Sequence, residues 1–547
     1  MSPATGLIVC LLLPPVAAAL LMLLSKSVPR HLTASPGNVP AAVPPAVPVA
    51  GAVLAVAFLL RIMTASPSGG GLPEDLTLNQ FGLLDDQLAR LWHLSCLLAG
   101  LLLLIGLYRQ CTSDQVCGLL LATGATALAG CTSDLLALLI CLELAAAGAA
   151  LACPAWKEAG QTGGLEMGRE TATVPVQTPR LAGIVPLLLA GLGALLLYGV
   201  CGTSRLEVAA EVMETAWLSP GPLEPAGEIS VAAMAGAVLL LAGIGFRLPV
   251  FPSSGRCSPD GMLPSGPQFS GLWQSENEAG VQAVLVQSFF PRAAAVVALL
   301  RLAETVLPVL HEPAVVVLLV LCVLMALTGG LQLLKQRRPL ECFCWLLMVQ
   351  SALWLPGLMA VILLESPAAA GTVAEAAGSA QSLRFLLVLA FLAETCLVAG
   401  LLLSLQQWQK TSTPVGWQDD LAGLIRTRPV AATVLCLLLL AAAGCPPLMT
   451  FWTRLLLLQS VVSVHLESAG EVAPLLHPGL AAAGLAAAGG VACGLVATLR
   501  LLSTITLEPP RGSIAGSSSH VPLLVAALLT LGLLTGGLCP LLWWPGQ

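Results

Sequence analysis

Five charged side chains in this sequence stand inside long apolar runs. Two are carboxylates, Glu143 in TSDLLALLICLELAAAG and Glu394 in VLAFLAETCLVAG, and three are arginines, Arg247, Arg292 and Arg454. A carboxylate can bind and release a proton, whereas arginine stays charged in essentially any protein environment. Charged groups at membrane depth are costly, usually face a bundle interior or a wet cavity, and mark ion pathways. The five residues therefore predict a path for protons or other ions.

Helix breakers accompany two of these arginines. GIGFRLPVFP carries Pro249 and Pro252, and LAAAGCPPLMTFWTRLLLLQ carries Pro446 and Pro447. Proline removes a backbone donor and pushes the preceding residue out of helical geometry. Backbone groups freed at membrane depth persist only where protein or water satisfies them. Each break is therefore expected to open a polar site beside its arginine.

The elements that must position these residues are membrane-spanning helices. Hydrophobic residues make up 57% of the 547 and charged residues only 10%, with a mean hydropathy of +0.91. Apolar blocks of about 20 residues match the length that a helix needs to cross about 30 Å of hydrocarbon. The sequence predicts an all-α polytopic membrane protein with about fourteen spans, near 5–25, 41–63, 90–108, 115–131, 133–153, 181–201, 229–251, 281–305, 313–334, 340–364, 383–406, 429–459, 477–501 and 520–541.

Charge in the connectors predicts the orientation of the chain. Connectors after odd-numbered spans carry fifteen Lys and Arg residues, and those after even-numbered spans carry four, Arg61, Arg90, Arg205 and Arg384. The positive-inside rule then places both termini outside the cytoplasm. Arg301, near a span end, is expected to snorkel to the interface. Residues 202–228 are interpreted as an acidic external loop and 253–277 as a flexible insertion.

Cofactor chemistry has little support in the sequence. The seventeen cysteines contain no CxxC pair and lie mostly in apolar runs, which favours packing over metal binding. No phosphate-cradling glycine loop or dinucleotide fingerprint stands out. The net charge of -6 predicts no nucleic-acid partner. We expect no metal or cofactor to be bound by this chain itself.

Several segments resemble one family when taken in order. They are GLLLATGATALAGCTSDLLALLICLEL, GIGFRLPVFPSSGRCSPD, FFPRAAAVVALLRL, DDLAGLIRTRPVAATVLCLLLLAAAGCPPLMTFWTRLLLL and LVATLRLLSTITLEPP. Their order and spacing resemble the proton-translocating, antiporter-like membrane subunits of respiratory NADH:quinone oxidoreductase. The resemblance runs from about residue 80 to 510 and matches Glu143 to the family's intramembrane glutamate. Within the family, LAGLIRTRP and LLYG are most similar to subunit N.

The resemblance implies a fold and a function. The fold would contain two inverted five-helix repeats with two broken helices: spans one to three in 1–110, one repeat in 111–306, the other in 307–505, and a last helix in 506–547. The function would be that of a membrane-arm subunit coupling quinone reduction elsewhere in the complex to proton transfer. NADH and quinone would be used by the complex, with no redox site in this chain. Implied partners are other membrane subunits and the bilayer of a bacterial inner membrane.

The sequence also departs from the family pattern. Arg247, Arg292 and Arg454 stand where the family has lysines, and Ile184, Leu340, Gln350 and Ser254 where it has lysine or histidine. Glu394 has no counterpart in the pattern, so a packing role and a proton-relay role both stay open. Two alternatives remain: a non-conducting structural or regulatory subunit with a degenerate channel, and a cation/proton antiporter or hydrogenase-type membrane subunit.

Overall fold

The computed structural model describes most of the chain. The described residues are 3–27, 46–64, 83–107, 112–152, 178–218, 226–248, 286, 289–336, 339–366, 373–406, 421–467, 476–510 and 521–538. Pro249, Pro252, Ser254 and the insertion 253–277 lie outside them, so the expectations placed on these residues stay predictions.

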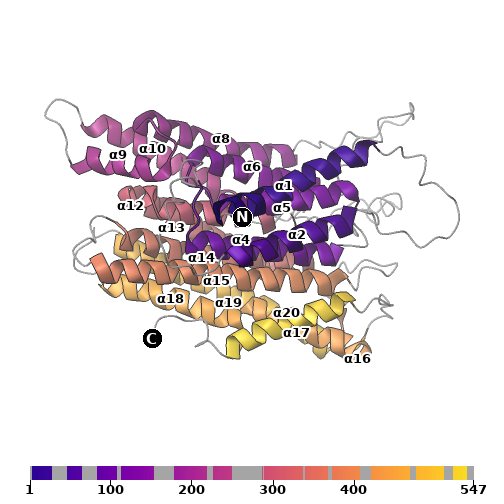
Figure 1. Cartoon of the computed structure of the whole chain (residues 1–547). Coiled ribbons are helices and arrows are strands. Elements are labelled where there is room, and N and C mark those ends of the chain that lie inside the picture. The colour runs from indigo at the N-terminus through magenta and orange to yellow at the C-terminus, as the bar shows by residue number, and fades with distance from the viewer. Residues whose placement is uncertain are drawn as a thin grey trace, which may run out of the picture.

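Long helices lying roughly alongside one another build the molecule (Figure 1). Residues 289–303 are also helical, and no strand occurs among the described residues apart from two isolated bridges. The named helices are α1 (Pro3–Ser27), α2 (Ala46–Thr64), α4 (Gln87–Leu107), α5 (Ser113–Ala129), α6 (Leu135–Leu151), α8 (Thr178–Cys201), α9 (Leu206–Leu218), α10 (Ala226–Gly245), α12 (Val306–Val309), α13 (His311–Lys335), α14 (Pro339–Leu364), α15 (Val373–Gln406), α16 (Leu424–Thr427), α17 (Pro429–Ala443), α18 (Met449–Glu467), α19 (Leu476–Thr506) and α20 (Val521–Leu538).

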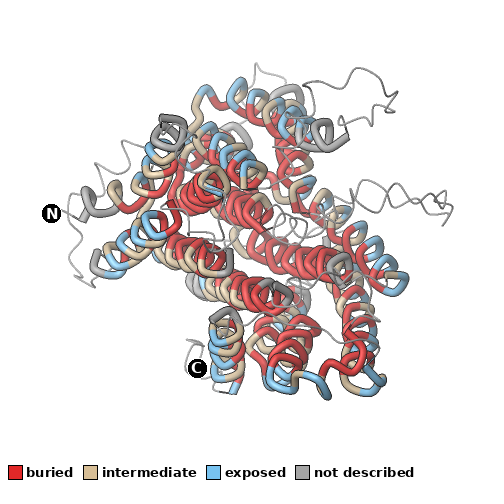
Figure 2. Tube along the Cα trace, turned by 90° about the vertical axis from the view of Figure 1, so that its right-hand side faces the viewer, coloured by how far each residue is buried: buried red, intermediate tan, exposed pale blue. Residues whose placement is uncertain are grey.

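The composition of the helices confirms an all-α polytopic membrane protein. Within the described ranges, six helices are long and apolar enough to cross a membrane, and seven shorter apolar helices accompany them. Seen along the helices, buried residues fill the centre and exposed ones face outward (Figure 2). α14 is central, because every residue of its most apolar stretch is buried. The total of fourteen spans and the division into repeats remain predictions.

Three sequence expectations about connectors are wrong. Part of the acidic loop 202–228 is a helix, α9. Arg61, Arg90 and Arg384 lie within α2, α4 and α15 rather than in connectors. Arg301 is only 2% exposed and does not snorkel, because it binds carboxylates inside the protein. Sequence position near a span end cannot distinguish the lipid-facing side of a helix from the side that faces its neighbours.

Local chemistry explains how α5 and α6 are held together. Asp134 is the N-cap of α6, since its carboxylate accepts hydrogen bonds from the backbone N–H groups of Leu136 (2.9 Å) and Ala137 (3.0 Å). The two helices approach so closely that a Cβ on Gly118 would lie 2.6 Å from the Gly148 carbonyl oxygen. Small residues permit such close approach between membrane helices. Glu143 on α6 is therefore held in a fixed place.

Candidate functional site

Glu143 and Arg247 form an ion pair between α6 and the end of α10. The Arg247 guanidinium donates to the Glu143 carboxylate, and it also contacts the Leu142 carbonyl oxygen at 3.5 Å. Arg247 is the second residue after the end of α10, in a turn where its N–H donates to the Ile244 carbonyl oxygen at 3.0 Å. The Glu143 side chain is 36% exposed and that of Arg247 only 8%. The pair thus has one buried cation and one carboxylate open to its surroundings.

Arg292 and Glu394 form a second ion pair, buried on both sides. Their side chains are only 4% and 6% exposed. Arg292 also donates to the Ser351 hydroxyl, and its guanidinium lies 5.1 Å from the centre of the Trp354 ring. A cation over an aromatic face is attracted by the negative charge of the ring face. Serine, tryptophan and carboxylate together hold one arginine inside the bundle.

The break between α17 and α18 holds the third arginine. α17 ends at Ala443, Gly444 takes the left-handed conformation with φ 74°, and α18 begins at Met449. Arg454 donates to the Ala442 carbonyl oxygen at 2.8 Å, a group that the break leaves without its helical partner. The Thr450 hydroxyl donates to Ala441 in the same way at 2.7 Å. The positive side chain thus satisfies backbone freed by the Pro446–Pro447 interruption.

Gln350 joins the second pair to the broken helix. The orientation of its amide follows from its partners, because the reverse would set donor against donor and acceptor against acceptor. In the orientation that satisfies both, its nitrogen donates to Glu394 at 2.7 Å and its oxygen accepts from Arg454 at 2.6 Å. Arg292, Glu394, Gln350 and Arg454 therefore form one hydrogen-bonded row, which we term the central chain.

The central chain draws on four separate helical segments. Arg292 comes from the helical stretch 289–303, Gln350 from α14, Glu394 from α15 and Arg454 from α18. One Glu394 carboxylate oxygen, Oε2, has no hydrogen-bond partner among the described residues. A buried carboxylate oxygen in that state is usually met by water. Glu394 is thus the carboxylate of the central chain, and its Oε2 atom can accept a further hydrogen bond.

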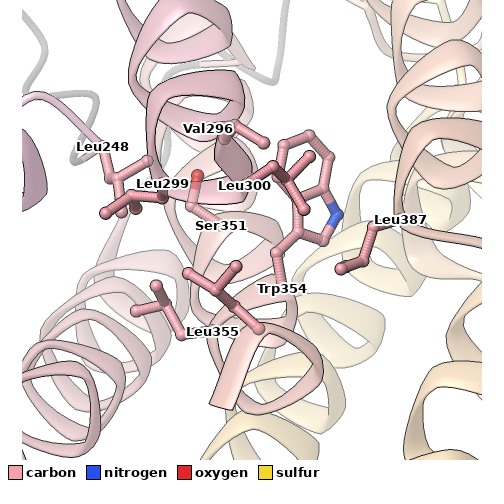
Figure 3. Close-up of a pocket in the computed structure, with 9 residues that line it drawn as sticks. Leu248, Val296, Leu299, Leu300, Ser351, Trp354, Leu355 and Leu387 are labelled. Atoms are coloured by element: carbon pink, nitrogen blue, oxygen red, sulfur yellow. The ribbon is translucent and has the colours of Figure 1, made fainter. Parts of the chain in front are cut away.

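A small cavity is lined by residues that adjoin the two arginines of the ion pairs (Figure 3). The volume of this cavity is about 20 Å³, counted as the space that the centre of a water molecule can occupy. That volume holds roughly one water molecule. Leu248, directly after Arg247, lines it, and so does Ser351, which binds Arg292. The remaining lining is apolar apart from Trp354. The cavity therefore offers a water molecule few hydrogen-bond partners.

The sequence located some of these residues and missed others. All five intramembrane charges occupy the described bundle, four of them in the two ion pairs and Arg454 at the helix break. Gln350 stood out in the sequence only as a departure from the family pattern, and Ser351 and Trp354 carried no signal. Within the described residues, no three His, Cys, Asp or Glu side chains gather closely enough to hold a metal ion.

Comparison with known proteins finds a family match over part of the chain. The sequence model of the family described as "NADH:quinone oxidoreductase/Mrp antiporter, TM" matches residues 369–469, which include Glu394 and the broken helix. A curated relative, NADH-quinone oxidoreductase subunit N of Erythrobacter litoralis (strain HTCC2594), is 36% identical over 98 residues. That alignment spans 18% of this chain and 19% of the relative.

Solved structures share the fold over nearly the whole chain. A chain of respiratory complex I from Thermus thermophilus with bound Aureothin has a TM-score of 0.64 at 19% identity, covering 98% of this chain and 99% of that one. A chain of the Mrp complex from Dietzia sp. DQ12-45-1b has a TM-score of 0.67 at 15% identity, covering 100% and 96%. The chain thus matches the NADH:quinone oxidoreductase/Mrp antiporter family over one segment, and over nearly its whole length it shares the fold of these membrane-complex chains.

Proposed function

We propose that this chain is a membrane-arm subunit, similar to subunit N, of a proton-translocating NADH:quinone oxidoreductase in a bacterial inner membrane. Its partners are the other membrane subunits of that complex, and NADH and quinone react on those other subunits. The segment similar to a curated subunit N and the whole-chain likeness to complex I support this assignment. The orientation with both termini outside the cytoplasm rests on the connector charges.

The central chain carries the mechanistic part of the proposal. Arginine does not release its proton, so Arg292 and Arg454 act as fixed charges. Glu394 lies between Arg292 and Gln350, and its free oxygen can take a proton from a water molecule. When the carboxylate is protonated its attraction to Arg292 weakens, which favours return of the proton to water. Glu394 is thus the group that exchanges protons, and the two arginines set its affinity.

Glu143, which lies outside the central chain, serves as a second exchange group. It pairs with a buried arginine but is itself more exposed, so water reaches it more readily than Glu394. The cavity is lined by Leu248, which follows Arg247 in the sequence, and by Ser351, which binds Arg292. Transfer between the two carboxylates requires water in that cavity, because no described side chain with a titratable proton lines it.

A non-conducting subunit is the second candidate. Two observations favour it. The cations of both ion pairs are arginines, and the two carboxylates, Glu143 and Glu394, are already engaged in those pairs. Such a row could hold the two halves of the protein together without passing protons. The subunit would then have a structural role only, and removing a carboxylate would affect assembly of the complex but not its proton yield.

Measurement of the proton yield per NADH oxidised separates these candidates. The whole complex is purified with Glu394→Gln and reconstituted in vesicles holding a pH-sensitive dye. We expect a reduced yield with the complex still assembled. Glu211→Gln on the exposed face of α9 is the matched control, because it makes the same chemical change away from the row. An unchanged yield in assembled Glu394→Gln complex would favour the non-conducting subunit.

A further inference from the structure

Two neutral oxygen atoms and a glycine surround the Arg454 guanidinium at the break between α17 and α18. One of its nitrogens, Nη2, donates to the Ala442 carbonyl oxygen at 2.8 Å and to the Gln350 amide oxygen at 2.6 Å. The other terminal nitrogen, Nη1, lies against Gly444, because a Cβ on this glycine would come within 2.3 Å of it. We term the Ala442 carbonyl, the Gln350 amide oxygen and Gly444 the break site.

The neighbouring carbonyl groups of α17 already have other donors. The Cys445 N–H donates to the Leu440 carbonyl oxygen at 3.0 Å. The Ala441 carbonyl oxygen accepts from the Gly444 N–H at 3.0 Å and from the Thr450 hydroxyl at 2.7 Å. The Ala442 carbonyl is therefore the one in this turn that binds the arginine.

The break site compensates a positive charge with dipoles. Glu394, the carboxylate of the central chain, pairs with Arg292 and is joined to Arg454 through the Gln350 amide. The central chain thus contains two cations and one anion. α17 ends one residue after Ala442, and the C-terminus of a helix carries roughly half a negative charge. This helix end and the amide oxygen of Gln350 face the surplus cation.

Glu394 also fixes the direction of the Gln350 amide. The amide nitrogen donates to the Glu394 carboxylate at 2.7 Å, so the amide oxygen must point toward Arg454. Ala442 is fully buried and Gln350 is only 4% exposed. Buried oxygen atoms of this kind need a donor or a cation as a partner. The break site is therefore held ready for a positively charged group.

Arg500 shows the contrasting case of an arginine at a surface helix end. It donates to the carbonyl oxygens of Leu334, at 3.2 Å, and of Gln336, where α13 ends. Arg500 is exposed, so water can take its place on these oxygens. Water has no such access to the buried oxygens of Ala442 and Gln350. The two arginines make similar contacts in different surroundings.

The chemistry of the break site matches that of cation sites in broken membrane helices. In transporters, unwound backbone carbonyls and the C-terminal ends of half-helices coordinate cations such as Na⁺. In potassium channels, carbonyl oxygens replace the hydration shell of the ion. The break site offers a carbonyl and an amide oxygen at the negative end of a half-helix. A monovalent cation is the class of ligand that these atoms would bind.

We propose that the break site is a monovalent-cation site that Arg454 fills with its own guanidinium. A free cation then has no place there while the side chain is present. Occupation of the site needs no turnover, so the site itself does not depend on the proposed function. Its consequence for transport, that no alkali cation passes through the break, does rest on the proposed function.

Free guanidinium should occupy the site once the tethered group is removed. The thermal midpoint of the assembled Arg454→Ala complex is measured with guanidinium chloride up to about 10 mM, which denatures little because the free energy of unfolding falls in proportion to denaturant molarity. Tetramethylammonium chloride, whose cation has no N–H donor, keeps the ionic strength constant. We expect a saturable rise of the midpoint in Arg454→Ala and none in wild type, because a ligand that binds the folded state stabilises it.

Arg500→Ala is the matched control for this experiment. It also removes an arginine from two carbonyl oxygens at a helix end, but at an exposed position. We expect guanidinium to leave its midpoint unchanged. If Arg454→Ala shows no rise, or if Arg500→Ala and wild type rise by the same amount, the break site is not a cation site.

Two further variants test the charge even if Arg454→Ala does not assemble. Arg454→Gln and Arg454→Lys both keep a donor for the Ala442 carbonyl, but only lysine keeps the positive charge. We expect the complex with Arg454→Lys to unfold at a higher temperature than that with Arg454→Gln. Equal midpoints would show that the break needs a hydrogen-bond donor and no cation, and the proposal would be wrong.

The results separate this proposal from the proposed function. A guanidinium response in Arg454→Ala together with an unchanged proton yield in Glu394→Gln would support the cation site and overturn the proton-exchange role of Glu394. No response in Arg454→Ala together with a reduced yield in Glu394→Gln would refute the cation site and leave the proposed function standing.

Discussion

Arg292 and Glu394, which are 102 residues apart in the sequence, form an ion pair with 4% and 6% of their side chains exposed. Removing one partner of such a buried pair typically costs about 3–5 kcal/mol, because the other charge is left uncompensated. The pair persists because Ser351, Trp354 and Gln350 supply further contacts to the two charges. The same contacts tie Glu394 to the broken helix.

Gln350 should control whether the central chain is continuous. Gln350→Met keeps the side-chain volume but removes both hydrogen bonds, so we expect a lower proton yield without loss of assembly. Gln350→His restores a donor and an acceptor and adds a titratable group, so the yield should match or exceed that of the wild type. Equal yields from the two variants would contradict the role of the bridge.

Arg454 should be replaceable by lysine. Arg454→Lys keeps a positive charge and a donor for the Ala442 carbonyl, and a desolvated lysine can also release a proton. We therefore expect normal or higher proton yield from this variant and a reduced yield from Arg454→Leu. Wild-type behaviour of Arg454→Leu in vesicles would show that the charge has no role.

Gly537 of α20 should be intolerant of a side chain. A Cβ there would lie 1.9 Å from the Pro447 carbonyl oxygen, so Gly537→Ala must displace the break. We expect a lower thermal midpoint of the complex and a lower proton yield. Gly532→Ala on the same helix is the control, because nothing lies within 4 Å of its Cβ and alanine favours the helix by roughly 0.5–1 kcal/mol. Equal behaviour of the two variants would mean that α20 does not support the break.

Asp86, which accepts two hydrogen bonds from Arg301, should make an acid-sensitive contribution to stability. Burial raises the pKa of this carboxyl, but the hydrogen bonds and charge of Arg301 outweigh burial and lower its pKa below 3.8. A lowered pKa in the folded state stabilises the protein above the unfolded value, and that stabilisation is lost as pH falls through the folded value. The thermal midpoint of wild type should therefore fall between pH 5 and 3 more steeply than that of Asp86→Asn. Parallel curves would contradict this assignment.

Membrane class and charge placement were predictable because they depend on local composition. Apolar blocks predict the helices. A proline pair followed by an arginine two turns later predicts the break between α17 and α18. Partners were harder to predict. Which helix faces which is set by packing between distant segments, so the sequence could not assign Arg292 to Glu394 or place Gln350 between Glu394 and Arg454.

Arg301 and Arg61 show the same limit. Each looked like an interfacial or connector residue, yet each side chain is buried against a carboxylate from another segment. The connector-charge rule counts residues along the chain and carries no information about which side of a helix they occupy.

Infrared difference spectroscopy on the assembled complex tests most directly whether Glu394 exchanges a proton. Spectra are recorded when a proton gradient is imposed on vesicles, with ¹³C-labelled glutamate to identify the carboxyl bands. We expect a protonated-carboxyl band that is present in wild type and in Glu211→Gln and absent in Glu394→Gln. A wild-type spectrum whose carboxyl bands are all retained in Glu394→Gln would contradict the central claim that Glu394 binds and releases the transported proton.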